Sequence, residues 1–239
     1  MGATATKLYP VGNRRIELET SPTAFMPASS SQMLARVLHI PLGSTVADLG
    51  CGVGNLAIYS ALEGAKRVHA VDLMESACEL ARINAIKNRV GDKVTVHCGN
   101  LFEPIPEDVM FDVIIGDLSG VADEVARLSP WFPEPVPTGG YDGTDHILGM
   151  LETAPKRLKR GGDLYLPISS LSNAPKILNA ADQAFGGKIE QIWKVDYPFC
   201  TELTHGVERL RAMQNDGLID FSKRGSLVFW TMWIYRAWS

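Results

Sequence analysis

Cysteine is scarce in this sequence, and no two cysteines are spaced for a metal site. Four cysteines occur in 239 residues, without a C-x-x-C pair, so the sequence implies no metal ion and no disulfide framework. Unpaired thiols suit a reducing compartment. The four are Cys51, Cys78, Cys98 and Cys200.

Long apolar runs are missing as well. Residues 1–15 lack the apolar core of a secretory signal. The most apolar run late in the chain, residues 226–238, is shorter than the ~20 residues that cross a bilayer as a helix, and it is better read as a buried strand. We therefore expect a cytoplasmic protein without a membrane partner.

A strong excess of charge of either sign is also absent. The formal net charge is −4, and the basic residues are scattered apart from a cluster within residues 156–160, where a helix C-terminus attracts cations. A nucleic-acid surface needs positive charge to neutralise phosphates. The composition therefore predicts no nucleic-acid partner, and it leaves the oligomeric state open, with a homodimer as one option.

What the sequence does have is a glycine-rich turn, Asp48-Leu-Gly-Cys-Gly-Val-Gly54, between a short apolar strand pattern and a helix pattern. Glycines let the backbone approach a ligand, and a helix that begins near Asn55 directs free N–H groups at it. A nucleotide-like cofactor is expected. The dinucleotide fingerprint needs its third glycine where this chain has Asn55, which argues against NAD.

The residues after the next two strand patterns fit this expectation. Asp72 ends the strand pattern RVHAVD, at the distance where α/β nucleotide sites place the acid that binds ribose hydroxyls. Asn100 and Leu101 follow the third strand pattern, where the first can bond an adenine edge and the second can cover its face. At this point the chain resembles the class I S-adenosylmethionine-dependent methyltransferases. The resemblance implies S-adenosylmethionine as the cofactor, held by Asp48, Gly50, Cys51, Gly52, Gly54, Asn55, Asp72, Leu73, Asn100, Leu101 and Asp117.

Strand and helix patterns alternate along the chain, which predicts an α/β fold with a doubly wound, mostly parallel seven-stranded sheet. The expected strands are 46–49, 68–72, 94–98, 111–117, 163–168, 189–195 and 227–235. The expected helices are 75–88, 145–158, with Pro155 at a kink or in the last turn, 174–185 and 205–215. We expect residues 1–35 to form an N-terminal extension and lid, and residues 36–239 to form the catalytic domain that binds the cofactor.

A narrower resemblance covers about residues 20–168. The opening SPTAFMPASSSQMLA, the motif CGNLF and the run GGYDGTDHILGMLETAPKRLKRGGDLYL are similar in order and spacing to the release-factor glutamine N-methyltransferases. That group carries Asn-Pro-Pro-Tyr after the fourth strand, and this chain has Asp117-Leu118-Ser119-Gly120. The prolines and the aromatic ring that hold a planar acceptor nitrogen are therefore lost.

This departure favours a small-molecule acceptor and predicts no transfer to a release-factor peptide or to duplex DNA. The expected catalytic residues are Asp117, Ser119, Tyr141 and Asp142, which are the polar groups after the fourth strand and in a glycine-flanked loop. Aromatic rings that could shield a cation are Tyr9, Phe25, Trp131 and Tyr141. The proline-rich segment 120–137 is expected to form a lid rim, a dimer contact or part of the acceptor site.

Two alternatives stay open at the level of the sequence. The first is an enzyme that consumes S-adenosylmethionine without methyl transfer, such as a cyclase that forms azetidine-2-carboxylate and methylthioadenosine from the cofactor itself. Loss of the acceptor motif motivates this alternative, because a cyclase needs no acceptor. The second is a non-catalytic subunit that only binds the cofactor.

Overall fold

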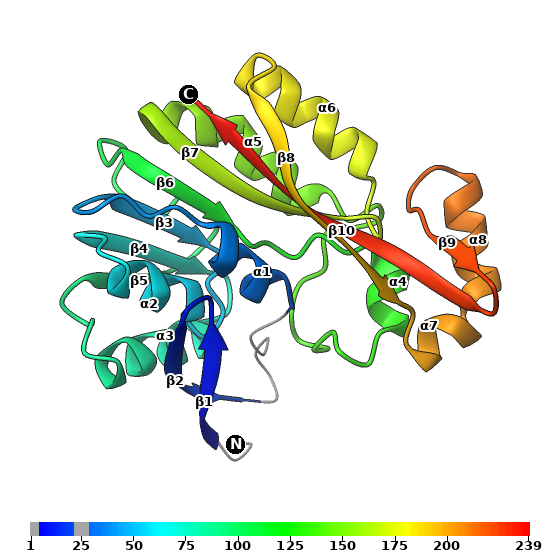
Figure 1. Ribbon diagram of the computed structural model, residues 1–239, viewed down its shortest axis with the longest axis horizontal. Coiled ribbons are helices and arrows are strands. Elements are labelled where there is room, and N and C mark those ends of the chain that lie inside the picture. Colours follow the sequence, from blue (N-terminus) through cyan, green and yellow to red (C-terminus); the bar gives the residue numbers. More distant parts are fainter. Residues whose placement is uncertain (1–4, 22–28) are drawn as a thin grey trace.

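The computed structural model describes residues 5–21 and 29–239, and its centre is an eight-stranded sheet (Figure 1). The order along the sheet is β5-β4-β3-β6-β7-β10-β8, and β9 pairs with β10. Strands β3 to β7 are parallel, whereas β10 runs antiparallel to β7, β8 and β9. The strands are β3 (Thr45–Leu49), β4 (Arg67–Asp72), β5 (Val94–Cys98), β6 (Phe111–Gly116), β7 (Leu158–Ser169), β8 (Ile189–Pro198), β9 (Ser222–Arg224) and β10 (Leu227–Trp238).

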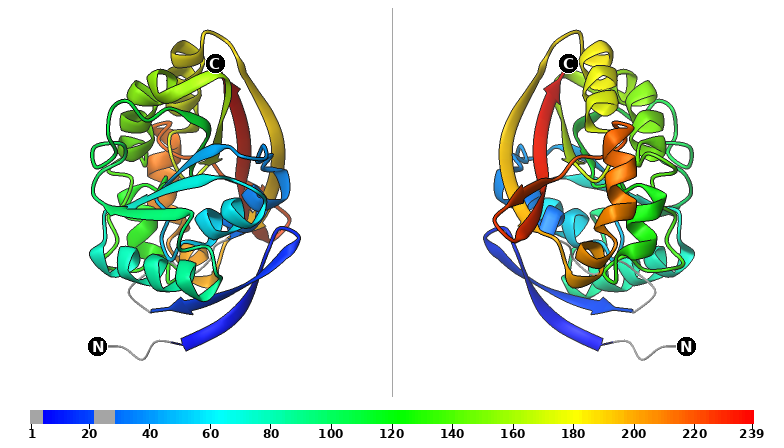
Figure 2. Two further views of the ribbon diagram at one scale, coloured as in Figure 1. Left: turned by 90° about the vertical axis from the view of Figure 1, so that its left-hand side faces the viewer. Right: turned by 90° about the vertical axis from the view of Figure 1, so that its right-hand side faces the viewer.

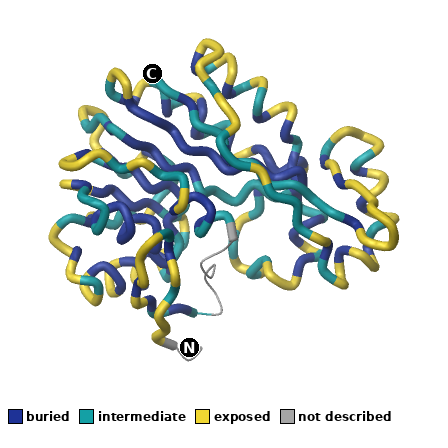
Figure 3. The backbone as a smooth tube through the Cα atoms, in the orientation of Figure 1, coloured by how far each residue is buried: buried dark blue, intermediate teal, exposed yellow. Residues whose placement is uncertain are grey.

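Helices cover both faces of this sheet, which confirms the doubly wound α/β prediction. Helices α2 (Asn55–Leu62) and α3 (Glu75–Lys87) pack on one face, where Val46, Val68 and Ile115 are buried. Helices α5 (Asp145–Arg157) and α6 (Ala174–Phe185) pack on the other. Because both faces are covered, the parallel strands β3, β4, β6 and β7 are buried along most of their length, whereas the edge strand β5 is partly exposed (Figure 3).

The N-terminal residues form a hairpin that the sequence analysis did not predict. Strand β1 (Ala5–Val11) pairs with β2 (Arg14–Thr20) through a two-residue turn that begins at Gly12. Figure 2 shows this hairpin at the edge of the molecule, apart from the large sheet. Ile16 and Leu18 are fully buried against α2 and α3, so the hairpin shares the core of the main domain.

Helix α1 (Ser29–Val37) follows the hairpin. The expected boundary between an extension and a catalytic domain, at residue 35, falls inside this helix. The division into an N-terminal lid and a catalytic domain stays a prediction. The part of the expected lid at residues 1–4 and 22–28, with Phe25, lies outside the described residues.

A third apolar cluster lies where β8 and β10 extend beyond the other strands (Figure 1). It joins α4 (Asp123–Leu128) to α7 (Thr201–His205) and α8 (Val207–Asn215). The predicted helix 205–215 is wrong at its start, because the chain forms two helices that separate at Gly206, where a side chain would meet Leu128 at 2.7 Å. Among the described residues, no helix has the length and apolar character needed to cross a membrane.

Candidate functional site

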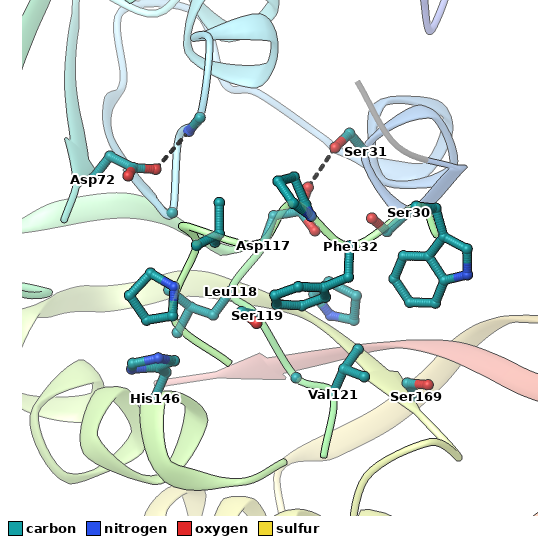
Figure 4. Close-up of a pocket in the computed structure, with 18 of the residues that line it drawn as sticks. Ser30, Ser31, Asp72, Asp117, Leu118, Ser119, Val121, Phe132, His146 and Ser169 are labelled. Atoms are coloured by element: carbon teal, nitrogen blue, oxygen red, sulfur yellow. Dashed lines mark hydrogen bonds between the residues drawn. The ribbon is translucent and has the colours of Figure 1, made fainter. Parts of the chain in front are cut away.

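A cavity of about 890 Å³ opens at the carboxyl ends of β3, β4 and β6 (Figure 4). The chain runs from β3 outward to β4 and β5, and then returns to β6 on the other side of β3. Ligands of open α/β sheets bind at such a reversal of strand order. The structure thus places the cavity where the sequence predicts a nucleotide-like ligand.

The glycine turn after β3 forms one wall. Gly50 has φ +77°, and a Cβ atom there would lie 2.7 Å from the main-chain oxygen of Asp117. Only glycine fits both this conformation and this close approach. Gly50, Cys51, Gly52 and Asn55 line the cavity, whereas Gly54 is not among its lining residues and packs against Ala81 of α3.

Asp72 at the end of β4 is held by main-chain amides. Its Oδ2 accepts a hydrogen bond from the Gly52 N–H at 2.8 Å, and its Oδ1 accepts one from the Met74 N–H at 2.9 Å. Burial raises the pKa of Asp72, and these amides partly offset the rise. A carboxylate oxygen has a second lone pair, so this fixed group can also accept bonds from two neighbouring hydroxyls of a ligand.

Asp48, at the end of β3, is buried without a partner. Its side chain is 0% exposed, and neither oxygen has a hydrogen-bond partner among the described residues. Burial first, and the nearby charge of Asp117 second, raise the pKa of Asp48 to about 8, while the main-chain N–H of Ala57, outside good hydrogen-bond geometry, lowers it. The buried Nδ2 of Asn55 is unpartnered in the same part of the chain. Polar groups left unpaired in a cavity wall indicate a ligand, and a carboxylate there fits a cation.

The residues after β5 line a less polar wall. Leu101 has φ +48°, which is unusual for a bulky residue and is found at ligand sites. Leu101, Leu73 and Asn100 line the cavity, and the Nδ2 of Asn100 donates to Glu103 at 2.9 Å. An apolar surface beside one polar edge is the arrangement that a planar base requires.

The segment after β6 faces the other half of the cavity. The Ser31 hydroxyl donates to Oδ2 of Asp117 at 2.5 Å, and the buried Oγ of Ser119 has no partner among the described residues. Burial raises the pKa of Asp117, while hydrogen bonds from Ser31 and Ser30 partly offset the rise. Five aromatic residues also line the cavity: Trp131, Phe132, Tyr197, Phe199 and Trp230.

Two residues expected at the catalytic end are not among those that line the cavity. Tyr141 is 68% exposed, and the Asp142 carboxylate bonds Thr144 at 2.6 Å and Lys176 at 2.9 Å. The glycine loop is held in place, since the Asp145 N–H donates to the Gly139 oxygen at 2.9 Å. Its glycines form a tight turn just before the start of α5, and a role of this loop as a lid stays a prediction.

The sequence analysis missed several residues that the fold brings to the cavity. Ser30 and Ser31 come from α1, His146 from α5, and Trp230 and Met232 from β10. In the segment 120–137, the residues that line the cavity are Gly120, Val121, Pro130, Trp131, Phe132, Pro133, Val136 and Pro137. The role of this segment as acceptor contact, lid rim or dimer contact stays a prediction. Tyr9 is not among the lining residues.

These features define the class of the protein. The carboxylate of Asp72 suits a ribose, the wall at Leu101 suits a base, and the unpaired Asp48 suits a cationic tail, so the cavity fits S-adenosylmethionine on a class I methyltransferase fold. The family model for ribosomal protein L11 methyltransferase (PrmA) matches residues 30–157. The chain therefore belongs to this family of S-adenosylmethionine-dependent methyltransferases.

Individual relatives support the same assignment. The release factor glutamine methyltransferase of Thermosynechococcus vestitus is 32% identical over 190 residues, which are 71% of this chain and 63% of that protein. The ribosomal protein L11 methyltransferase of Desulforamulus reducens is 42% identical over 106 residues, 44% of this chain and 33% of that protein. The chain thus spans between a third and two thirds of the length of these relatives.

Solved structures share the fold at low sequence identity. The T. thermophilus 16S rRNA N2 G1207 methyltransferase, in complex with AdoMet and guanosine, has a TM-score of 0.65 and 16% identity, over 99% of this chain and 50% of that one. The ribosomal protein L11 methylase of Lactobacillus delbrueckii has a TM-score of 0.52 and 20% identity, over 87% of this chain and 80% of that one.

The comparisons correct the expected acceptor and partners. The small-molecule acceptor and the cyclase that acts on the cofactor itself are wrong, because the relatives are methyltransferases named for protein substrates. The expected lack of transfer to a release factor stays a prediction. The exclusion of nucleic acid is withdrawn too, since rRNA and tRNA methyltransferases share the fold. The formal net charge of the whole chain was a poor guide to the partners, because it carries no information on which acceptor a single cavity binds.

Proposed function

We propose that this chain transfers a methyl group from S-adenosylmethionine to an amine nitrogen of a protein. The observation that carries the proposal is the position of Asp117 and Ser119, which stand between the glycine turn and the aromatic half of one cavity. The protein substrates in the names of the relatives support a macromolecular acceptor.

The cofactor half follows from the groups already described. Asp72 would hold the ribose hydroxyls, Asp48 a positive charge of the methionine part, and Asn100 and Leu101 the adenine. When bound, S-adenosylmethionine supplies an electrophilic methyl group. The chain itself then has to align the acceptor, exclude water and leave the nucleophile uncharged.

An amine fits the acceptor half better than a carboxamide does. An ionised Asp117 only accepts hydrogen bonds, so it pairs with an ammonium group and can take its proton. Aromatic walls attract the cation and, by desolvation, favour the neutral amine that attacks. The Ser119 hydroxyl can accept the remaining N–H. A planar amide also needs a donor for its oxygen and a stacking surface, which Leu118 and Gly120 do not offer.

Transfer of tritiated methyl groups tests the proposal. Bacterial ribosomal protein L11 and a release factor serve as the protein probes, with free lysine and glutamine as small-molecule controls. The proposal expects label in a protein, on a lysine or an α-amine after peptide mapping. Label on glutamine, or on a free amino acid alone, would contradict it.

The free cysteines are compatible with the proposed cytoplasmic location.

Removing the ribose-binding carboxylate should weaken cofactor binding. For Asp72→Ala we expect a loss of about 1.5 to 3 kcal/mol, or at least tenfold in affinity for S-adenosylhomocysteine, because a charged acceptor of two hydrogen bonds disappears. Calorimetry measures the change. Asp112→Ala is the control, since Asp112 pairs with Lys159 and does not line the cavity. Equal dissociation constants for Asp72→Ala and the wild type would remove Asp72 from the site.

Binding of the cofactor should also release a proton. At pH 7 a carboxyl group with a pKa of about 8, as for Asp48, is mostly protonated, and a cationic ligand lowers that pKa. Affinity should therefore rise with pH up to about 8 and fall above it, because the α-amino group of the ligand, with a pKa of about 8, then loses its own charge. Calorimetry in buffers of different ionisation enthalpy measures the released protons. Asp48→Asn should abolish the part that Asp48 contributes, and equal release in both proteins would refute this role.

A further inference from the structure

The carboxylate of Asp117 is held by a helix that lies far from it in the sequence. The Ser31 hydroxyl of α1 donates to Oδ2 of Asp117 at 2.5 Å, across 86 positions of the chain. The Ser30 hydroxyl, in the same turn, lies close enough to lower the pKa of this carboxylate. Both serines line the cavity (Figure 4), so their contact with Asp117 lies at its surface.

Asp117 differs in this respect from Asp72. Asp72 is fixed by two main-chain amides, one from its own loop and one from the glycine turn. Its orientation therefore does not depend on the position of the N-terminal residues. The side-chain partners that stabilise the charge of Asp117 are the two serine hydroxyls. The direction of the Asp117 carboxylate thus depends on the position of α1.

Helix α1 is positioned firmly enough to serve this purpose. Ser31 is 6% exposed. Leu34, one turn later, is fully buried in the apolar core between the sheet and helices α2 and α3. Met33, on the same helix, contacts Tyr197 of the cavity wall, whose hydroxyl lies 3.5 Å from the Met33 sulfur. A buried donor on an anchored helix holds its acceptor in one orientation, whereas an exposed serine would exchange it for water.

We propose that Ser31 is a positioning residue for methyl transfer, whose hydroxyl directs the Asp117 carboxylate toward the acceptor amine. The inference rests on the proposed role of Asp117. Ser31 donates its single hydrogen to Oδ2, which leaves the other lone pairs of the carboxylate for the acceptor. The hydroxyl also stabilises the charged form of Asp117, which is the form that binds an ammonium group and accepts its proton.

Titration of Asp117 tests the inference without any acceptor. The carboxyl carbon of aspartate is labelled with ¹³C, and the Asp117 signal is assigned as the one missing from Asp117→Asn. In Ser31→Ala we expect the pKa of Asp117 to rise by about one unit, because a donor to its charged form is lost. Ser31→Thr keeps the hydroxyl and should restore the wild-type titration.

The matched control is Ser60→Ala. Ser60 is a buried serine whose hydroxyl bonds the Leu56 oxygen of its own helix. It is not among the residues that line the cavity, so the titration of Asp117 should not change. An unchanged Asp117 titration in Ser31→Ala would overturn the inference and leave the proposed function intact.

Turnover separates the inference from the proposed function. On the acceptor probe that takes up label, Ser31→Ala should lower kcat about tenfold, with the KM for S-adenosylmethionine within twofold of the wild type and the acidic limb of the rate profile moved to higher pH. Ser31→Thr should recover most of kcat. If Asp117→Asn keeps full activity, the proposed function fails and the positioning role fails with it, even where the titration shift is seen.

Discussion

Replacement of Asp117 by asparagine is expected to lower kcat by at least about 100-fold, or about 2.7 kcal/mol of transition-state stabilisation. Asparagine keeps the shape of the side chain, but it cannot accept a proton and does not pair with an ammonium group. Affinity for S-adenosylhomocysteine should change less than threefold, because the glycine turn, Asp48 and Asp72 are intact. Steady-state kinetics and calorimetry on the same preparation measure both quantities.

A matched control lies at the other end of the same strand. Asp112 is the second residue of β6, pairs with Lys159 at 2.7 Å and is not among the residues that line the cavity, so Asp112→Asn should keep the wild-type kcat. A loss of cofactor affinity in Asp117→Asn, with turnover preserved, would make Asp117 a cofactor ligand. Full retention of both would move the chemistry to another group in the cavity.

A methyl group at Gly50 is expected to abolish cofactor binding. The added Cβ atom would lie 2.7 Å from the main-chain oxygen of Asp117 and 3.2 Å from the Leu118 side chain. Both neighbours belong to the segment after β6, so the turn and this segment have to move apart. We expect Gly50→Ala to reduce affinity for S-adenosylmethionine at least about 100-fold, or about 2.7 kcal/mol, as measured by calorimetry.

Gly43→Ala separates the clash from backbone strain. Gly43 has φ +78°, nearly the same as Gly50, but an added Cβ would have nothing within 4 Å. This variant should lose about 1 kcal/mol of stability, because its conformation disfavours alanine, and should bind the cofactor as the wild type does. Normal affinity in a folded Gly50→Ala protein would mean that the turn is not the cofactor wall.

The cofactor half of the cavity could be predicted because its residues follow strands directly. Asp48, Asp72 and Asn100 each come at or just after the end of a parallel strand, and the carboxyl ends of such strands meet at one edge of the sheet. Strand spacing alone therefore brings them together. The glycine turn adds a local conformation that few sequences without a ligand require.

The acceptor half could not be found in this way. Ser31 meets Asp117 across 86 residues, and Trp230 reaches the cavity because β10 inserts between β7 and β8 in reverse direction. Neither contact follows from local periodicity. The hairpin, in contrast, had a signal: Ile16 and Leu18 alternate with polar residues after Gly12-Asn13, a turn pair typical of hairpins.

Tyr141 and Asp142 show that a local prediction does not place a residue in the fold, since neither is among the residues that line the cavity. The glycines at 139, 140 and 143 do mark a tight loop at the start of a helix, as the sequence indicates. Asp142 of this loop pairs instead with Lys176 of α6, a partner 34 residues later. Glycine density predicts a special backbone conformation, but it does not say which side of the sheet that conformation faces.

A crystal structure of the complex with S-adenosylhomocysteine tests the central claim most directly, since it places both halves of the cavity around one ligand. The account predicts the ribose hydroxyls on Asp72, the amino group near Asp48, and the sulfur facing Asp117, Ser119 and the aromatic wall that includes Trp230. A ligand bound in the cavity with its sulfur turned away from Asp117, or bound elsewhere on the chain, would contradict the account.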